Sequence, residues 1–131
     1  MPHPKLDMIG IIVKDMSQAL AFYRALGLNI PKELDAEKHA EITLYNGLRI
    51  AWDTHEVIQS FNDGWQAPTD STPRMGMAFL CESPQAVDEH YAQIIGLGYD
   101  SHQAPFDAFW GQRYAQVKDP DGNIVDLFAA L

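Results

Sequence analysis

One carboxylate stands among apolar residues near the end of the chain. Residues 124–128 read Ile-Val-Asp-Leu-Phe, and alternation along a strand puts Asp126 on the same face as Ile124 and Phe128. The preceding residues, Asp-Pro-Asp-Gly-Asn at 119–123, predict a tight turn, because proline fixes φ, glycine supplies a positive φ and Asx side chains bond the local backbone. A carboxylate between apolar neighbours either faces a cavity or lies at an edge.

The histidines and the cysteine give no second catalytic pattern. The histidines are His3, His39, His55, His90 and His102. No two of them have i, i+4 helical spacing. We therefore expect their side chains to be exposed and titratable. A local functional site is conceivable only where His55 precedes Glu56. Cys81 shares strand parity with Met77 and Phe79, where a buried thiol is usually inert.

Composition excludes several classes of partner. The 131 residues are 47% hydrophobic, enough for one domain with its own core. A net charge of −9 opposes binding to nucleic acid or to anionic membranes. A single cysteine cannot form an internal disulfide, and no apolar run suits a signal peptide or a membrane span. We therefore expect a cytoplasmic protein without nucleic-acid or membrane partners.

The chain reads as the same series of elements twice. The first copy has a strand at 6–13, a helix capped by Asp15 or Ser17 and ended by Gly27, a short extended piece at 28–31, and strands at 39–45 and 48–53 around Asn46-Gly47. The second has a strand at 75–81, a helix from Ser83-Pro84 to Gly98, a short strand at 99–103, a loop, and strands at 113–118 and 124–129.

This repetition predicts a duplicated βαβββ unit. The units span about 1–53 and 74–131, and residues 54–73 connect them, with one helical turn near 57–61. Each unit alone would expose one face of its sheet, so the two units must combine.

With these features the chain resembles the vicinal oxygen chelate superfamily, which includes glyoxalase I, extradiol dioxygenases, and fosfomycin- and bleomycin-resistance proteins. The matching segments are 12–17, Phe22-Tyr23 and Leu26-Gly27 in the first unit, and 77–79 and 119–127 in the second. The resemblance implies a single α+β domain over residues 1–131. Its two βαβββ units would form curved mixed sheets around a cup, with helices on the outer face.

In the enzymes of that superfamily, four side chains in the cup hold a divalent metal ion. The corresponding positions here carry Met8, Ala51, Gly76 and Asp126. Only Asp126 offers a hard oxygen ligand, and one carboxylate cannot hold a catalytic metal that needs three or four protein ligands. We therefore expect neither a metal ion nor another cofactor.

Strand parity and the resemblance predict a small-molecule pocket in the cup. The expected ligand-binding residues are Met8, Arg49, Ala51, Gly76, Phe109, Trp110, Arg113, Asp126 and Phe128. Small residues leave room and apolar residues form walls, as in ligand pockets, although neighbouring loops can fill the same space. Trp110 either lines the pocket, as similar Trp-Gly segments do in bleomycin-resistance-like proteins, or packs under its loop. Arg113 either steers an anionic ligand or forms a structural ion pair, which the excess of acids favours.

The resulting hypothesis is a non-metal member of the superfamily, similar to bleomycin-resistance proteins, that sequesters or carries an apolar or aromatic molecule. The alternatives are a metal-dependent lyase, isomerase or dioxygenase with displaced ligands, and a metal-free enzyme with Asp126 as general base.

We also expect a homodimer. The edge strand at 6–13 offers unpaired backbone groups, and the connector is long enough for units of two chains to pair, as the resemblance implies.

Overall fold

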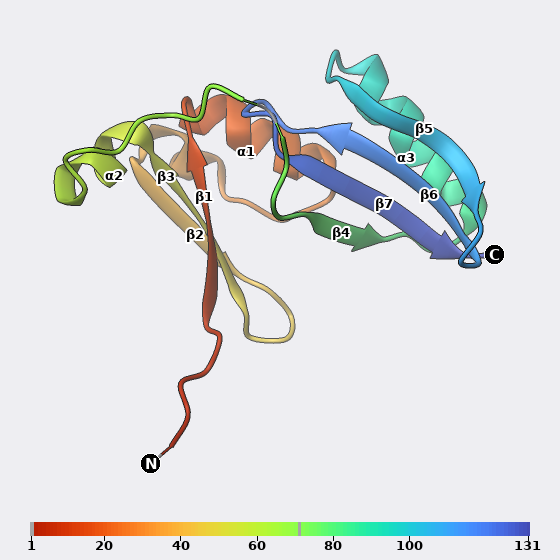
Figure 1. Ribbon diagram of the computed structural model, residues 1–131, viewed down its shortest axis with the longest axis horizontal. Coiled ribbons are helices and arrows are strands. Elements are labelled where there is room, and N and C mark those ends of the chain that lie inside the picture. The colour runs from red at the N-terminus through yellow and green to blue at the C-terminus, as the bar shows by residue number, and fades with distance from the viewer. Residues whose placement is uncertain (1, 71) are drawn as a thin grey trace. The chain divides into compact units, whose positions relative to one another are not determined.

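The computed structural model describes residues 2–70 and 72–131. The chain divides into two compact units, one ending at Pro68 and the other beginning at Thr69, and each contains a mixed sheet with one or more helices (Figure 1). The predicted α+β class is confirmed. None of the helices formed by these residues has the length and apolar character needed to cross a membrane.

The first unit has a three-stranded sheet in the order β1-β3-β2. Its elements are β1 (Met8–Val13), α1 (Met16–Ala25), the 3-10 helix η1 (Lys32–Ala36), β2 (His39–Thr43), β3 (Arg49–Thr54) and α2 (His55–Phe61). Strand β1 is parallel to β3, and β2 is antiparallel to it. Asp15 begins α1 by accepting a hydrogen bond from the Gln18 amide at 3.0 Å, which selects one of the two predicted caps.

The core of the first unit lies between α1 and one face of this sheet. Tyr23 of α1 and Trp52 of β3 are fully buried, with ring centroids 5.5 Å apart. Parity predicts Trp52 as a core residue, and its burial confirms this. Side chains at alternate positions, among them Met8 and Arg49, therefore lie on the face opposite α1.

The short extended piece predicted at 28–31 does not form a strand, so the first sheet has three strands rather than the four of a βαβββ unit. The Arg24 guanidinium donates hydrogen bonds to the backbone carbonyls of Ile30 at 2.8 Å and Pro31 at 2.9 Å, and it pairs with Asp35 at 2.8 Å. Because a side chain occupies these carbonyls, they do not take part in a strand ladder.

The hairpin between β2 and β3 turns at the predicted Asn-Gly pair, but its loop has three residues, 45–47. Leu44 donates its amide across the loop at 2.8 Å, and Gly47 has a φ of +88°. This is a type I turn followed by a left-handed glycine. A two-residue loop would shift the register by one and turn alternate side chains to the other face. The observed register sets His39 opposite Asp53.

The second unit has a four-stranded sheet in the order β4-β7-β6-β5. Its elements are β4 (Met77–Leu80), α3 (Pro84–Gly96), β5 (Ser101–Ala108), β6 (Gln112–Lys118) and β7 (Ile124–Ala130). The predicted start of α3 is confirmed, since Ser83 accepts from the Ala86 amide at 3.1 Å. Strand β5 is longer than the predicted strand at 99–103. It runs to Ala108 with register irregularities, which an edge strand tolerates.

Helix α3 lies along one face of this sheet (Figure 1). Its buried residues Val87 and Ile94 form the core with alternate residues of β6 and β7, such as Val117. The predicted turn at 119–123 is confirmed, because the buried Asp119 carboxylate accepts hydrogen bonds from two amides within it, at 2.9 and 2.8 Å. This turn fixes the register that brings β7 beside β6.

Candidate functional site

The side chains of interest lie on the face of the second sheet opposite α3, which we call the site face. The register places Gln116 opposite Asp126, and Tyr114 opposite Phe128. Since Ala115 and Val117 are buried on the α3 side, these four alternate residues lie on the site face. Its members from β4, β6 and β7 are Ala78, Leu80, Gln112, Tyr114, Gln116, Lys118, Ile124, Asp126, Phe128 and Ala130.

Two donors fix the Asp126 carboxylate. The Tyr114 hydroxyl donates to Oδ2, and the Gln116 side-chain amide donates to Oδ1 at 2.9 Å. Burial, and then the hydrogen bond to Asp126, raises the pKa of Tyr114 to about 12. The phenol therefore keeps its proton at neutral pH and remains a donor to the carboxylate.

Asp126 lines a cavity of about 220 Å³ within the second unit. The other lining residues are Pro73, Arg74, Met75, Gly76, Gln116 and Ile124. Of the two possibilities given by its sequence context, Asp126 thus faces a cavity. Gly76 leaves open space, since a Cβ atom there would meet nothing within 4 Å. Pockets for drug-sized ligands usually measure about 300–1,000 Å³, so this cavity suits one functional group of a ligand or a small molecule.

Three aromatic rings, those of Phe106, Phe109 and Trp110, continue the site face beyond Tyr114. Trp110 lies at the turn between β5 and β6, with its ring centroid 5.3 Å from that of Tyr114, 5.0 Å from that of Phe109 and 6.2 Å from that of Phe106. All of these contacts are edge-to-face. The Trp110 indole nitrogen donates to Gln112 at 2.8 Å. Phe109 is 98% exposed and Trp110 49% exposed, so the cluster leaves apolar surface open to a ligand.

Arg113 lies away from this cluster. It pairs with Asp88 of α3 at 2.9 Å and with Asp107 of β5 at 3.1 Å. These contacts place its guanidinium on the α3 side of the sheet, so the structure contains the ion pair that the excess of acids favours. Phe128, in contrast, lies half-buried on the site face with Tyr114 as its cross-strand partner.

The candidates in the first unit have different surroundings. Arg49 pairs with Glu41 at 2.9 Å and with Asp7, so its charge is already compensated. Ala51 is fully buried and does not leave the room that its small size suggests. Met8, partly exposed, lies on the edge strand β1 opposite Arg49 in the register.

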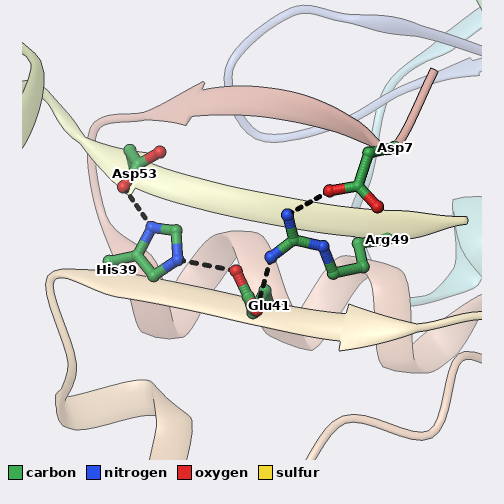
Figure 2. Close-up of polar contacts among 5 residues, drawn as sticks. All are labelled: Asp7, His39, Glu41, Arg49 and Asp53. Atoms are coloured by element: carbon green, nitrogen blue, oxygen red, sulfur yellow. Dashed lines mark hydrogen bonds and ion pairs between the residues drawn. The ribbon is translucent and has the colours of Figure 1, made fainter. Parts of the chain in front are cut away.

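A row of charged side chains crosses the first sheet and was not predicted (Figure 2). The His39 ring contacts Asp53 through Nδ1 at 2.5 Å and Glu41 through Nε2 at 3.0 Å, and Arg49 extends the row to Asp7. The hydrogen bond with Asp53, and then that with Glu41, raises the pKa of His39. His39 is exposed, as expected, but its two carboxylate partners were not predicted. The hairpin register is the signal that would have revealed the row.

The residues present do not fit the metal site of the resembled enzymes. Of the four corresponding positions, Met8, Ala51, Gly76 and Asp126, only the last has a carboxylate, and both of its oxygens accept protein hydrogen bonds. No group of three or more His, Cys, Asp or Glu side chains is placed to hold a metal ion anywhere in residues 2–70 and 72–131. The two carboxylates at His39 contact different ring nitrogens and do not converge on one point.

Comparisons with known proteins agree with this fold. A search of curated proteins found no match. Among solved structures, a glyoxalase/bleomycin resistance protein/dioxygenase family enzyme from Burkholderia phytofirmans PsJN is 19% identical, with a TM-score of 0.82 over 98% of this chain and 100% of its own. A glyoxalase-related enzyme from Fulvimarina pelagi is 18% identical, with a TM-score of 0.78 over 95% of this chain and 87% of its own.

A glyoxalase/bleomycin resistance protein/dioxygenase from Nocardioides is 20% identical, with a TM-score of 0.75 over 100% of this chain and 86% of its own. At such identities these structures establish a shared fold. The sequence pattern of one family matches residues 5–127, nearly the whole chain. The chain therefore belongs to the Glyoxalase/Bleomycin resistance protein/Dioxygenase superfamily.

Proposed function

We propose that the protein binds a small apolar or aromatic molecule on the site face, without a metal ion. One observation carries this proposal: exposed aromatic rings continue directly into a hydrogen-bonded polar group. Trp110 packs on Tyr114, and Tyr114 donates to Asp126, which lines the cavity. An apolar surface with a few fixed polar groups is the usual chemistry of a small-molecule site.

The exposure of the rings favours binding over simple packing. A tryptophan that only supports its loop would bury its ring, whereas half of Trp110 and nearly all of Phe109 are exposed. Exposed, contiguous apolar surface on a protein usually marks a site of interaction. A planar ligand edge-stacked on these rings would cover this surface and contribute about 0.5–1.5 kcal/mol per ring pair beyond its area burial.

The donor set favours binding without a metal. Catalytic metal sites use about three protein ligands, and the matching positions of this chain supply one carboxylate. The Tyr114 and Gln116 donors hold that carboxylate in one orientation. Such a group suits direct hydrogen bonding to a ligand.

Calorimetric titration with skatole, a neutral planar aromatic, tests this proposal. We expect saturable binding that weakens about tenfold in Trp110→Ala, since a buried aromatic contact contributes on the order of 1 kcal/mol or more. Trp65→Ala is the matched control, because Trp65 lies in the first unit, against His55. If both variants and the parent protein bind skatole with equal affinity, the aromatic cluster is not part of the binding site.

A second function rests on the same carboxylate. Asp126 lines the cavity and is held by two donors, as a general base for proton abstraction must be positioned. In this case the protein would be a metal-free lyase or isomerase of the superfamily. Exchange of an acidic substrate proton with deuterated solvent, lost in Asp126→Asn, is the signature that separates catalysis from binding alone.

A further inference from the structure

A second charged group lines the cavity at Asp126. Arg74 belongs to the segment that precedes β4 and lines the cavity together with Gln116 and Asp126. The chain has four arginines, and the other three pair with carboxylates: Arg24 with Asp35, Arg49 with Glu41 and Asp7, and Arg113 with Asp88 and Asp107. Within the described part of the chain, no carboxylate lies within 4.0 Å of the Arg74 guanidinium.

The cavity therefore has one positive and one negative group, each with capacity for a ligand. The planar guanidinium can bind a carboxylate through two parallel hydrogen bonds. The Asp126 oxygens each accept one protein hydrogen bond, and carboxylate oxygens can accept more. Lys118, opposite Ile124 in the register, adds a second cation at this end of the site face.

These charges discriminate between ligand classes. A simple anion would be attracted by Arg74 and repelled by Asp126, and a simple cation would be attracted by Asp126 and repelled by Arg74. A zwitterion with adjacent opposite charges satisfies both groups. It also carries no net charge, so the −9 charge of the protein does not repel it at long range.

We propose that the cavity binds the zwitterionic head group of an aromatic α-amino acid. Arg74 binds its carboxylate, Asp126 accepts from its ammonium group, and its ring lies on the aromatic cluster at Tyr114 and Trp110. The 220 Å³ cavity suits such a head group, while the exposed rings accommodate a side chain that extends beyond it. This inference rests on the proposed function and specifies its ligand class.

Four indole compounds test the inference in calorimetric or NMR titrations of the intact chain. Tryptophan carries both charges, indolepropionate only the carboxylate, tryptamine only the ammonium, and skatole neither. We expect the loss of either charged group from tryptophan to weaken binding about fivefold, a value that allows for solvent screening at a partly exposed site. Tryptophan should therefore bind most tightly, and its advantage should shrink as salt is added.

Two variants separate the charged contacts. Arg74→Gln should weaken the binding of tryptophan and indolepropionate about fivefold, leave skatole unchanged, and slightly strengthen tryptamine, whose ammonium group Arg74 repels. Asp126→Asn should weaken tryptophan and tryptamine about fivefold, leave skatole unchanged, and slightly strengthen indolepropionate, whose carboxylate Asp126 repels. Lys5→Gln is the matched control, because it removes the same charge from an exposed position in the first unit. Arg74 is also exposed, so its substitution should leave the fold intact.

The outcomes distinguish this inference from the proposed function. If tryptophan binds no more tightly than skatole while skatole binding still depends on Trp110, the zwitterion inference is wrong and the aromatic site stands. An equal loss in Lys5→Gln and Arg74→Gln would reduce the effect to long-range charge and overturn the role of Arg74. If none of the four compounds binds, both proposals fail.

Discussion

Tyr114 offers the sharpest test of the site face in the absence of any ligand. Its hydroxyl donates to Asp126, and burial together with this bond raises its pKa from 10.0 to about 12. The folded protein therefore disfavours ionisation of this phenol. Tyr114→Phe removes the hydroxyl while keeping the ring in contact with Trp110 and Phe106.

We expect Tyr114→Phe to lower the free energy of unfolding by about 1.5 kcal/mol at neutral pH. A hydrogen bond to a charged group contributes about 1.5–3 kcal/mol, and the lower end applies because Asp126 is only half-buried and keeps Gln116 as a donor. Urea unfolding followed by circular dichroism measures this loss. Tyr45→Phe is the control, since the Tyr45 side chain is fully exposed and should be replaced without effect.

The contribution of Tyr114 to stability decreases at high pH. Because the folded pKa of Tyr114 lies above its unfolded value, its contribution to stability is fully present below pH 10 and is lost as the pH rises through about 12. In an ultraviolet titration of the tyrosines, the parent protein should show one phenol that ionises at unusually high pH, and Tyr114→Phe should lack this ionisation. Asp126→Asn should lower the pKa of Tyr114 only partly, because burial is the larger cause of the shift.

The account of the site face is refuted if the phenol missing from the Tyr114→Phe titration ionises near pH 10. An unchanged free energy of unfolding would contradict it independently. Either result would mean that the hydroxyl and the Asp126 carboxylate do not interact in solution.

Three further predictions concern His39, metal binding and assembly. NMR titration should place the pKa of His39 above 6.5, and Asp53→Asn should lower that pKa. The stability that this contact contributes is present below pH 6.5 and is lost as the pH rises through the folded pKa. A His39 pKa of 6.5 would contradict the interaction with Asp53 and Glu41. Dialysed protein should hold no near-stoichiometric Zn, Ni, Fe or Mn, and one equivalent that disappears in Asp126→Ala would overturn the metal-free proposal. We propose a homodimer, so light scattering at low micromolar concentration should give about twice the 14.7 kDa chain mass, largely independent of salt. A monomer mass would refute this proposal.

The sequence predicts those parts of the fold that depend on local chemistry. The Ser83 cap, the turn at 119–123 and the positive φ of Gly27 and Gly98 follow from residue types at fixed offsets. Strand parity likewise placed Asp126 and Phe128 on one face. These signals need no knowledge of distant residues.

The remaining features depend on contacts between distant residues or on exact register. The missing strand in the first sheet results from Arg24 reaching carbonyls six and seven residues away. The row at His39 requires a three-residue loop at 45–47, whereas Asn-Gly most often indicates a loop of two. Burial of Ala51 depends on neighbouring side chains, which small size alone does not reveal. Arg74 is the first residue after the predicted connector at 54–73, and no motif in the sequence marks it as a ligand-binding residue.

The central claim is that the site face of the second sheet binds a small aromatic molecule. Its most direct test is NMR mapping with skatole on nitrogen-labelled protein, which also detects weak binding. We predict saturable shifts at the Trp110 indole, the Gln116 side-chain amide and the backbone of Ile124–Ala130, with the Trp52 and Trp65 indoles of the first unit unchanged. Saturable shifts confined to the first unit, or no saturable shifts at any concentration that skatole solubility allows, would contradict the account.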